Sequence, residues 1–526
     1  MILSIMIFQT ILTKLVAISI MKARNAPVGA DKEKENIMKQ NSLFLRVICL
    51  SLSLCMLALA LVACKDDEKS PVATGTKAPT GTALPTDEFG KIKDALDLTL
   101  DRSFSILGVE EQKRQYYAEK DEIDVVKAAI YDRNSTVEDR LNVEIEWNFK
   151  KGSWAERTGF TKIVSDLVAG GSTTTPDAVI CYNLMPYVLA NNGLVQNLYN
   201  TKHIDLTMPW WPSAYTGEAV LNETVYGLVE SSAYGTLCQM TGVFFNNDLI
   251  EEHKLESPYT MVENNTWTFD NMLATVKDVY VDKDTVSGKS AGDFFGVSTG
   301  TSPKLDSWLY GMGYRLSDFN EAGELELLIN DSTFQEAIDR FADAFEYDAF
   351  FEVDTAHGKL FTEERVVFYQ TALVLLSSLK DLEINYGIVP APKGSSGQKE
   401  YITHLSNTHE AWCVPIQCRS LDDSSAVIEC MASESYRRVD PIYFETCVKL
   451  RYAPDERLGG MYDLIRDSIT FDLFYLFCGT FSESPLTHYR PCAYEPNSNN
   501  WTGKWDSYGQ IWTDGFNDIV ELYGIQ

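Results

Sequence analysis

The stretch that decides the fold is 176–182, Pro-Asp-Ala-Val-Ile-Cys-Tyr, in which a turn signal precedes five apolar residues. A short apolar run with such a flank is typical of a buried strand. Upstream lie a strand-like segment, 143–147, and a helical segment, 160–168. The face of a preceding helix is predicted from the spacing of Ile123, Val126, Ile130, Val137 and Leu141. This alternation predicts an α/β fold with largely parallel sheets.

A later helix is signalled by its start and by its apolar face. Asp331-Ser332-Thr333 is a capping sequence, and Gln335 follows Ser332 at the capping-box distance. The buried face of this helix is predicted to hold Phe334, Ile338, Phe341 and Phe345.

The N-terminal part contains an export signal at 38–63. A basic start (38–46) precedes an uncharged apolar run (47–63), which is followed at once by Cys64. Such a tripartite pattern is typical of a signal peptide. The ending 61–64, Leu-Val-Ala-Cys, resembles the lipobox of bacterial lipoproteins, which implies that Cys64 is acylated and becomes the mature N-terminus. The alternative is a transmembrane helix of about 17 residues, the low end of a spanning length.

The segments beside this signal are not expected to fold with the body. Residues 1–37 precede the signal and are interpreted as an upstream extension, with Met38 as the alternative start. Residues 65–90 are rich in Pro, Gly, Thr and charge, and cannot bury enough apolar area to offset their ordering entropy. We therefore expect a flexible linker over 64–100 that keeps the body close to a membrane surface.

The composition limits the classes of function. The chain has 526 residues, 45% hydrophobic, and a formal net charge of −30. It is therefore globular and is not expected to bind nucleic acid, since phosphate binding needs clustered Lys and Arg. Eight cysteines lie beyond Cys64 and none forms a Cys-x-x-Cys pair, so most are expected to be buried small apolar residues.

Several stretches, in this order, resemble the extracellular solute-binding proteins (family 1) of bacterial ABC importers, the sugar-binding group that includes maltose-binding protein. They are 132–145 (a helix leading into a strand), 176–180 (a strand ending at a cleft), 193–198, 242–250 (Gly-Val-Phe-Phe-Asn-Asn-Asp-Leu-Ile), 265–270 and 385–393. At 247 this chain has Asn where that family usually has Lys.

The resemblance implies a two-lobe, periplasmic-binding-protein-like fold of type II, with the ligand in a cleft between lobes joined by hinge crossovers. It places 101–215 and 394–435 in lobe 1, and 216–393 and 436–526 in lobe 2. The implied protein is not an enzyme. It is a monomer without cofactor or metal, on the outer face of the cell membrane, that passes a sugar or oligosaccharide to a permease.

Candidate ligand contacts are aromatic or polar residues at strand ends and in loops, because sugars need aromatic faces and planar hydrogen-bonding groups. They are Tyr182, Asn183, Tyr234, Thr301, Ser302, Asp306, Trp308, Tyr369, Gln370, Asn407 and Trp412. For each, ordinary packing in the core is the competing interpretation. The pair Trp210-Trp211 is expected to be structural.

The sequence motifs that would indicate other functions are incomplete. Gly296-Val-Ser298-Thr-Gly300 matches a hydrolase nucleophile elbow, but the residues after it are loop-like where a helix should begin at once. His404 and His409 are too loosely spaced for a zinc site, and 282–286 fails the calcium-loop pattern at Val286. A secreted carbohydrate-active hydrolase and a binding protein for peptides or another small solute are the alternatives.

Overall fold

A computed structural model describes residues 85–87, 90–299, 302–330, 332–351, 358–379, 382–451, 456–494 and 500–525. The chain divides into two compact units, Met1–Thr80 and Gly81–Gln526, and the described residues all belong to the second. The predicted extension, signal peptide and Cys64 lie outside the described residues, as do Thr301 and Asp331. Among the described helices, none is both long and apolar enough to cross a membrane.

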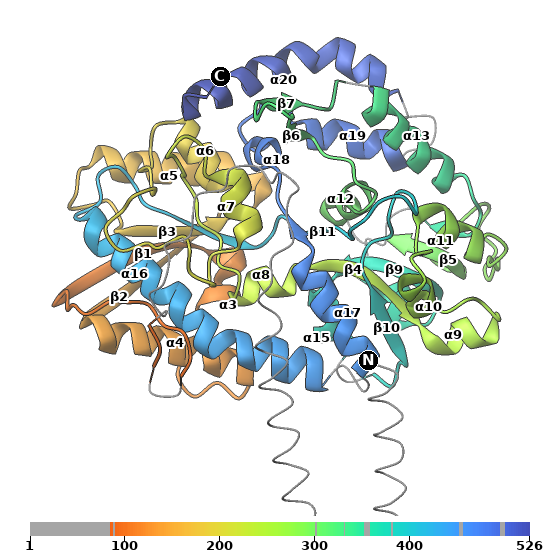
Figure 1. The fold of residues 1–526 in the computed structure, drawn as a ribbon, viewed down its shortest axis with the longest axis horizontal. Coiled ribbons are helices and arrows are strands. Elements are labelled where there is room, and N and C mark those ends of the chain that lie inside the picture. Colours follow the sequence, from red (N-terminus) through yellow and green to blue (C-terminus); the bar gives the residue numbers. More distant parts are fainter. Residues whose placement is uncertain are drawn as a thin grey trace, which may run out of the picture. The chain divides into compact units, whose positions relative to one another are not determined.

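The first of two main sheets has four strands in the order β12-β3-β1-β2. Its strands are β1 (Arg102–Val109), β2 (Val143–Lys150), β3 (Ala178–Tyr182) and β12 (Glu410–Cys413). β1 pairs in parallel with both β2 and β3, while β12 joins β3 in the antiparallel direction. The strands predicted at 143–147 and 178–182 are thus confirmed, and this sheet with its covering helices is here called lobe 1 (Figure 1).

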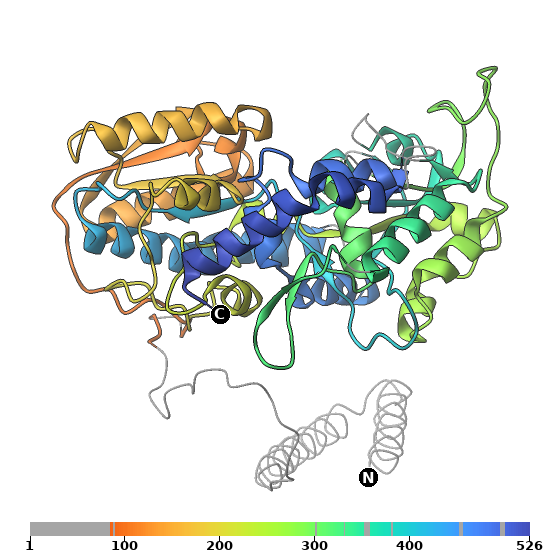
Figure 2. The ribbon, with the colours of Figure 1, turned by 90° about the horizontal axis from the view of Figure 1, so that it is seen from above.

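Figure 2 shows helices on both faces of the lobe 1 sheet. The helices of lobe 1 are α3 (Lys113–Tyr116), α4 (Val125–Leu141), α5 (Arg157–Ala169), α6 (Met185–Asn191), α7 (Ser213–Ala219), α8 (Tyr234–Cys238) and α16 (Leu421–Glu434). α16 continues through two π-helical segments, Ser435–Val439 and Pro441–Arg451.

One residue of the helical face predicted for α4 is misplaced. Ile130, Val137 and Leu141 are buried, as the spacing predicts. Ile123 is 98% exposed, because Asp124 caps the helix and ends its face there. The Asp124 carboxylate accepts from the backbone N–H groups of residues 126 and 127.

The second main sheet has five strands in the order β10-β4-β9-β5-β8. They are β4 (Thr241–Asn246), β5 (Phe295–Thr299), β8 (Phe350–Phe351), β9 (Val366–Ala372) and β10 (Tyr386–Val389). β4 is antiparallel to both its neighbours, whereas β5 is parallel to β8 and β9. The lobe 1 sheet is largely parallel, as expected, with β12 as its antiparallel strand. The lobe 2 sheet is mixed, which corrects that expectation for this half. The antiparallel members β4 and β12 belong to chain segments that have just crossed between the sheets.

The helices of this second half, here called lobe 2, are α9 (Asn247–Glu252), α10 (Pro258–Glu263), α11 (Phe269–Val276), α12 (Ser302–Gly311), α13 (Ser332–Phe345), α14 (Lys359–Thr362), α15 (Leu376–Leu379) and α17 (Glu456–Asp467). A hairpin of β6 (Ser317–Phe319) and β7 (Leu325–Leu327) follows α12. The predicted apolar face of α13 is confirmed, since its four phenylalanine and isoleucine side chains are buried.

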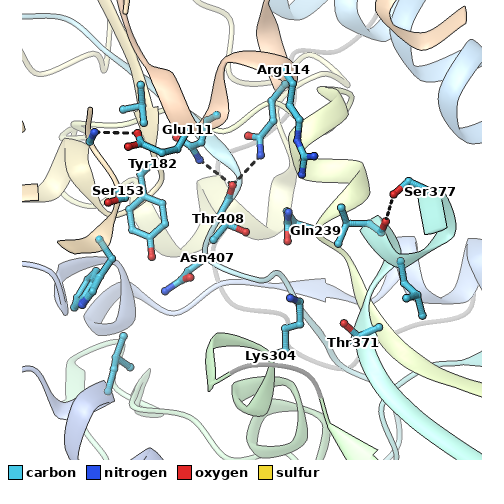
Figure 3. A pocket seen from close by; sticks show the side chains of 18 of the residues that line it. Glu111, Arg114, Ser153, Tyr182, Gln239, Lys304, Thr371, Ser377, Asn407 and Thr408 are labelled. Atoms are coloured by element: carbon cyan, nitrogen blue, oxygen red, sulfur yellow. Dashed lines mark hydrogen bonds between the residues drawn. The ribbon is translucent and has the colours of Figure 1, made fainter. Parts of the chain in front are cut away.

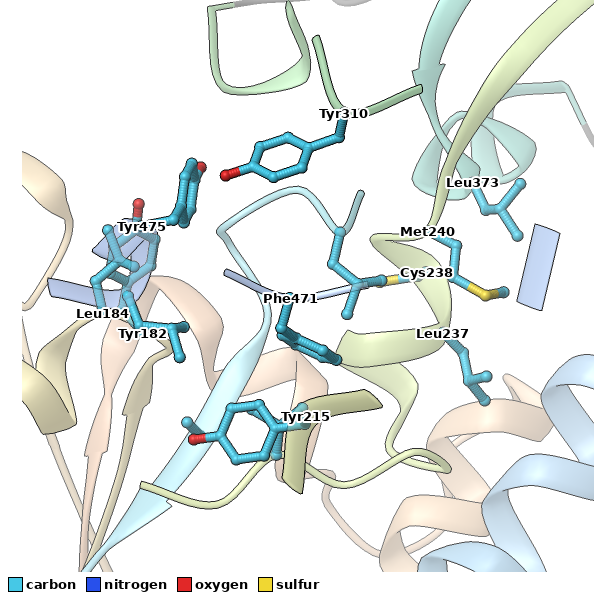
Figure 4. Close-up of a cluster of buried hydrophobic side chains, with 14 of the residues drawn as sticks. Tyr182, Leu184, Tyr215, Leu237, Cys238, Met240, Tyr310, Leu373, Phe471 and Tyr475 are labelled. Carbon is cyan, nitrogen blue, oxygen red and sulfur yellow. The ribbon is translucent and has the colours of Figure 1, made fainter. Parts of the chain in front are cut away.

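Three chain segments cross side by side between the lobes. Met240, just before β4, forms a bridge with Leu405. Beside that bridge, β11 (Thr403–His404) pairs in parallel with β13 (Ile469–Thr470). Aromatic side chains pack around these segments (Figure 4), among them Phe471, whose ring centroid lies 5.0 Å from that of Tyr215 in α7. Paired short strands with few residues are suited to serve as a hinge.

The C-terminal helices touch both lobes. They are α18 (Leu473–Phe477), α19 (Pro485–Tyr494) and α20 (Trp501–Tyr523). At one end of α20, Trp501 donates its indole N–H to the Ile329 carbonyl in lobe 2 at 2.9 Å. At the other end, the Tyr523 hydroxyl donates to the Ala219 carbonyl at the end of α7 in lobe 1. Figure 2 shows α20 crossing from one lobe to the other.

Buried polar contacts tie other parts of lobe 1 together. Trp210 and Trp211 donate their indole N–H groups to the Glu429 carboxyl of α16 at 3.1 and 3.0 Å, which agrees with the structural role expected for the pair. Asp94, within the segment predicted as linker, is buried and pairs with Arg140 of α4 at 2.6 Å. The eight described cysteines are free and all but Cys418 are buried, as expected.

Candidate ligand-binding cavity

A cavity of about 840 Å³ lies between the lobes, within the size range of small-molecule sites. Lobe 1 contributes Tyr182 and the turns that follow β1 and β2, so the cavity lies at the carboxyl ends of its three parallel strands. Ligands of open α/β sheets bind at this edge, where loops can present polar groups. From the rest of the chain come Gln239, Lys304, Tyr369, Thr371, Val374, Leu375, Ser377, Ser378, Asn407, Thr408, Leu486, Thr487, Arg490 and Pro491.

Four amide side chains in the cavity wall have unused acceptor oxygens. Gln112 and Gln115 both donate their Nε2 groups to the Thr408 carbonyl, at 2.8 and 3.0 Å (Figure 3). Their Oε1 atoms are buried without a hydrogen-bond partner, as are Gln239 Oε1 and Asn407 Oδ1. Buried polar atoms in folded proteins are nearly always hydrogen-bonded, so these oxygens are suited to accept from a ligand's hydroxyl groups.

An aromatic corner stands beside these amides. The rings of Trp154 and Tyr182 lie 6.4 Å apart at 60°, and the Arg157 guanidinium lies 4.2 Å from the Trp154 ring. Burial raises the pKa of Tyr182, so its phenol stays neutral and can donate a hydrogen bond. Such a corner offers both a flat apolar face and a polar group to a ligand.

The charged residues of the cavity differ in whether they have a partner of opposite charge. Arg490 is satisfied by the buried Asp306 carboxylate, with contacts of 2.9 and 2.5 Å. Glu111 accepts from the Gly152 backbone N–H at 3.1 Å and is exposed. Arg114 and Lys304 also line the cavity.

Three of the residues predicted to contact a ligand line the cavity: Tyr182, Tyr369 and Asn407. Asp306 lies directly behind the wall, where it holds Arg490 and also accepts from the Tyr475 hydroxyl at 2.8 Å. Its position is thus that of a residue supporting the wall.

Five other predicted residues lie outside the cavity lining, four of them buried and Tyr234 half-buried. Trp308 packs edge-on against Phe269 with centroids 5.7 Å apart, and Trp412 donates its indole N–H to the Glu230 carboxylate at 2.6 Å. Both indoles are fully buried and are not among the lining residues. The remaining three, also outside the lining, are Asn183, Tyr234 and Gln370.

Each of these three residues contacts another part of the protein. The Asn183 backbone N–H donates to the His409 carbonyl at 3.1 Å. Gln370 accepts from the Thr299 hydroxyl at 2.5 Å and donates to the Ser307 hydroxyl. The Tyr234 ring meets the Tyr443 ring edge-on at 4.8 Å. Ser302 begins α12, and Thr301 falls outside the described residues.

Sequence reasoning did not single out several residues of the wall. Trp154 comes after Gly152-Ser153, directly beyond β2, so a turn with an aromatic residue after a predicted strand was a usable signal. Gln112 and Gln115 follow β1, a strand that the sequence patterns did not reveal. The Lys304 position gave no signal, because a lysine near a helix start is normally solvated.

The structure also shows where the two motifs of other functions lie, the Gly-x-Ser-x-Gly sequence and the acidic residues near 282–286. Ser298 of the Gly-x-Ser-x-Gly sequence lies inside β5 and is fully buried, where a nucleophile elbow needs a turn. Asp282, Asp284 and Asp293 bring carboxylate oxygens within 4.8 Å of one another. The Asp293 carboxylate already accepts from the backbone N–H groups of Lys283 and Ser290, both at 2.9 Å.

The fold is similar to that of several solved sugar-binding proteins. The sugar-binding protein MalE from Xanthomonas citri superposes with a TM-score of 0.53 at 11% identity, over 80% of this chain and 99% of that one. The galacto-N-biose-/lacto-N-biose I-binding protein of the ABC transporter from Bifidobacterium longum gives 0.53 at 10% identity, over 81% and 98%. The cyclic α-maltosyl-1,6-maltose binding protein from Arthrobacter globiformis gives 0.51 at 14%, over 76% and 95%.

These similarities confirm the predicted class of fold, a two-lobe solute-binding fold of type II, and they extend over nearly the whole length of each of these proteins. At such low identities they establish the fold alone. No protein-family model and no curated protein sequence matches the chain.

Proposed function

We propose that this chain captures a sugar or oligosaccharide in the cavity between its lobes and delivers it to the permease of an ABC importer. The observation that carries the proposal is the wall of four amide side chains with unused oxygens beside the Trp154–Tyr182 corner. Amide oxygens accept hydrogen bonds from sugar hydroxyls, and aromatic rings pack against the C–H faces of sugar rings. The structural neighbours named above bind sugars, which supports the same assignment.

The proposed work is conformational and breaks no bond. A ligand that contacts both lobes binds the closed arrangement more tightly than an open one and shifts the population toward closure. The crossings at Met240, 403–405 and 469–470 are the segments that bend. The lobe boundaries expected from the sequence are 101–215 with 394–435 and 216–393 with 436–526. As part of this proposal the first exchange of lobes lies at Met240, because α7 and α8 belong to the helices of lobe 1.

The proposal includes a lipid anchor at Cys64 on the outer face of the membrane. The lipobox-like ending at 61–64 supports it, as does the Pro-, Gly- and Thr-rich segment 65–90 that separates the cysteine from the body. Mass spectrometry of the protein purified from membranes would show an acylated Cys64 at the mature N-terminus. An unprocessed chain containing residues 38–63 would contradict it.

A secreted carbohydrate-active hydrolase is the competing function. Glycoside hydrolysis by the usual route needs two carboxyl groups on either side of the bond. Glu111 is the one carboxylate among the described cavity-lining residues, which favours binding. Isothermal titration against a glycan panel, followed by product analysis, separates the two. Saturable binding with intact glycan recovered supports the receptor, and turnover supports the hydrolase.

We predict that Trp154→Ala weakens binding of the captured sugar about tenfold, because it removes the apolar face of the aromatic corner. Trp147→Ala is the matched control, since Trp147 is a half-buried aromatic residue of the same lobe that does not line the cavity. Equal affinities of the two variants, both folded by thermal melting, would remove Trp154 from the site.

A further inference from the structure

The charge of the cavity is opposite to that of the protein as a whole. The chain carries a formal net charge of −30. Among the described residues that line the cavity, the cations are Arg114, Lys304 and Arg490, and the carboxylate is Glu111. Charges lining a low-dielectric cleft focus the local field, so the sign of the wall selects the sign of the ligand.

We propose that the captured carbohydrate is anionic, with its acidic group bound between Arg114 and Lys304. This inference rests on the proposed function and specifies its substrate class. The acidic group is a carboxylate, sulfate or phosphate, since all three present oxygens that a guanidinium and an ammonium can bind.

Lys304 is the less solvated of the two cations. It lies in the first turn of α12 with its side chain partly buried, and among the described residues it pairs with no carboxylate. Burial lowers its pKa, which shows that its surroundings disfavour the charged form. The positive end of the α12 dipole adds to the local potential. A desolvated cation is costly unless an anion compensates it.

Arg114 enters the same cavity from the other lobe. It lies in α3, just after β1, and is exposed without an ion pair in the described part of the chain. Figure 3 shows Arg114 and Lys304 reaching the cavity from opposite sides, with Gln239 between them. Both interact electrostatically with Cys238. Burial raises the pKa of that thiol, so it stays neutral and supplies no counter-charge.

The other charged groups of the wall do not compensate this pair. Arg490 and Asp306 neutralise each other through two hydrogen bonds. Glu111 is exposed, accepts from the Gly152 backbone N–H, and in the described part of the chain forms no ion pair with Arg114 or Lys304. If the lobes close on a neutral sugar, Lys304 loses further solvent without gaining a counter-ion. An acidic group on the sugar offsets that loss, and the amide oxygens still receive its hydroxyl groups.

The test uses calorimetric titration of the full chain with matched pairs of oligosaccharides. In each pair the neutral oligosaccharide differs from the acidic one by a single group. One pair has a glucose residue where the other member has a glucuronic acid residue, and the other pairs have a free hydroxyl where the acidic member has a sulfate or phosphate ester. The variants are Arg114→Gln and Lys304→Gln. The controls are Lys120→Gln and Lys277→Gln, which change the net charge equally at exposed positions outside the cavity.

We expect an acidic member to bind at least tenfold more tightly than its neutral partner, and more weakly at high salt. Each cavity variant should lose about tenfold or more for the acidic member, while the controls remain like wild type. Which acidic member binds identifies the group as carboxylate, sulfate or phosphate.

Tighter binding of neutral sugars, unchanged in Arg114→Gln and Lys304→Gln, would overturn this inference and leave the proposed function intact. Failure of every glycan, neutral or acidic, to bind the folded protein would overturn both.

Discussion

At the residue scale, a buried carboxyl of the lobe 1 sheet gives a pH-dependent signature. Glu410 of β12 accepts from the Gly235 backbone N–H at 3.3 Å. Burial, with a smaller contribution from Glu230, raises the pKa of Glu410 to about 8. Its ordinary pKa is 4.5, so the folded protein keeps this proton across neutral pH, whereas the unfolded chain has lost it.

The sign of the effect follows from proton linkage. Between pH 6.5 and 8 the folded state binds more protons at Glu410 than the unfolded state, so its contribution to the free energy of unfolding falls as pH rises. The slope is about 1.4 kcal/mol per pH unit at most. Burial lowers the pKa of His404 and of His409 to about 4, and these histidines change stability in the opposite direction at lower pH. The window above pH 6.5 avoids them.

We predict that Glu410→Gln, which keeps a neutral group of similar shape, flattens the fall in stability between pH 6.5 and 8. Denaturant unfolding of both proteins at several pH values measures it. Glu434→Gln is unsuitable as a control because Glu434 pairs with three arginines, so the exposed Glu144→Gln serves. Parallel pH profiles for Glu410→Gln and wild type would show that this carboxyl is ionised in the folded state.

The contrast between Trp154 and Trp308 shows what could be predicted for the site. Both are aromatic residues beside polar ones, yet Trp308 lies on the side of α12 that packs on Phe269, while Trp154 lines the cavity. Local sequence indicates that a residue follows a strand. It does not indicate which residues from distant parts of the chain pack beside that residue. Those long-range contacts decide whether the residue lines a cavity or is buried in the core.

At the element scale, the cap of α4 is a local contribution that can be measured. Asp124 satisfies the backbone N–H groups of residues 126 and 127, at 2.9 and 3.1 Å. We predict that Asp124→Ala lowers the free energy of unfolding by about 1 kcal/mol, the usual cost of losing such a cap. Chemical denaturation measures it.

The neighbouring residue supplies the control. Ile123 is almost fully exposed, so Ile123→Ser should change the free energy of unfolding by less than about 0.5 kcal/mol. If Ile123→Ser lowered the free energy of unfolding more than Asp124→Ala does, Ile123 would belong to the apolar face of α4, as the sequence spacing indicates.

Elements with strong periodicity or a clear turn signal were predictable, and those defined by pairing were not. The β3 strand and the apolar face of α13 follow from short runs of residues. The antiparallel places of β4 and β12 depend on where the chain crosses between lobes. Strand direction in a sheet is a property of such crossings, so residue periodicity carries little information about it.

At the scale of the whole molecule, capture of a ligand between the lobes requires that the lobes move as units about the paired crossings. Phe471 and its neighbours keep the crossing segments packed, while α20 contacts lobe 2 through Trp501 and lobe 1 through Tyr523. A hinge with such flanking contacts allows two arrangements that differ in the width of the cavity, and ligand contacts to both lobes favour the narrower one.

The measurement that tests this most directly is small-angle X-ray scattering of the full chain, with and without a saturating oligosaccharide identified by calorimetry. We predict that the radius of gyration falls on saturation, and that Trp154→Ala requires about tenfold more sugar for the same change. A radius of gyration that stays constant while calorimetry shows the site filled would contradict closure of two lobes around the ligand.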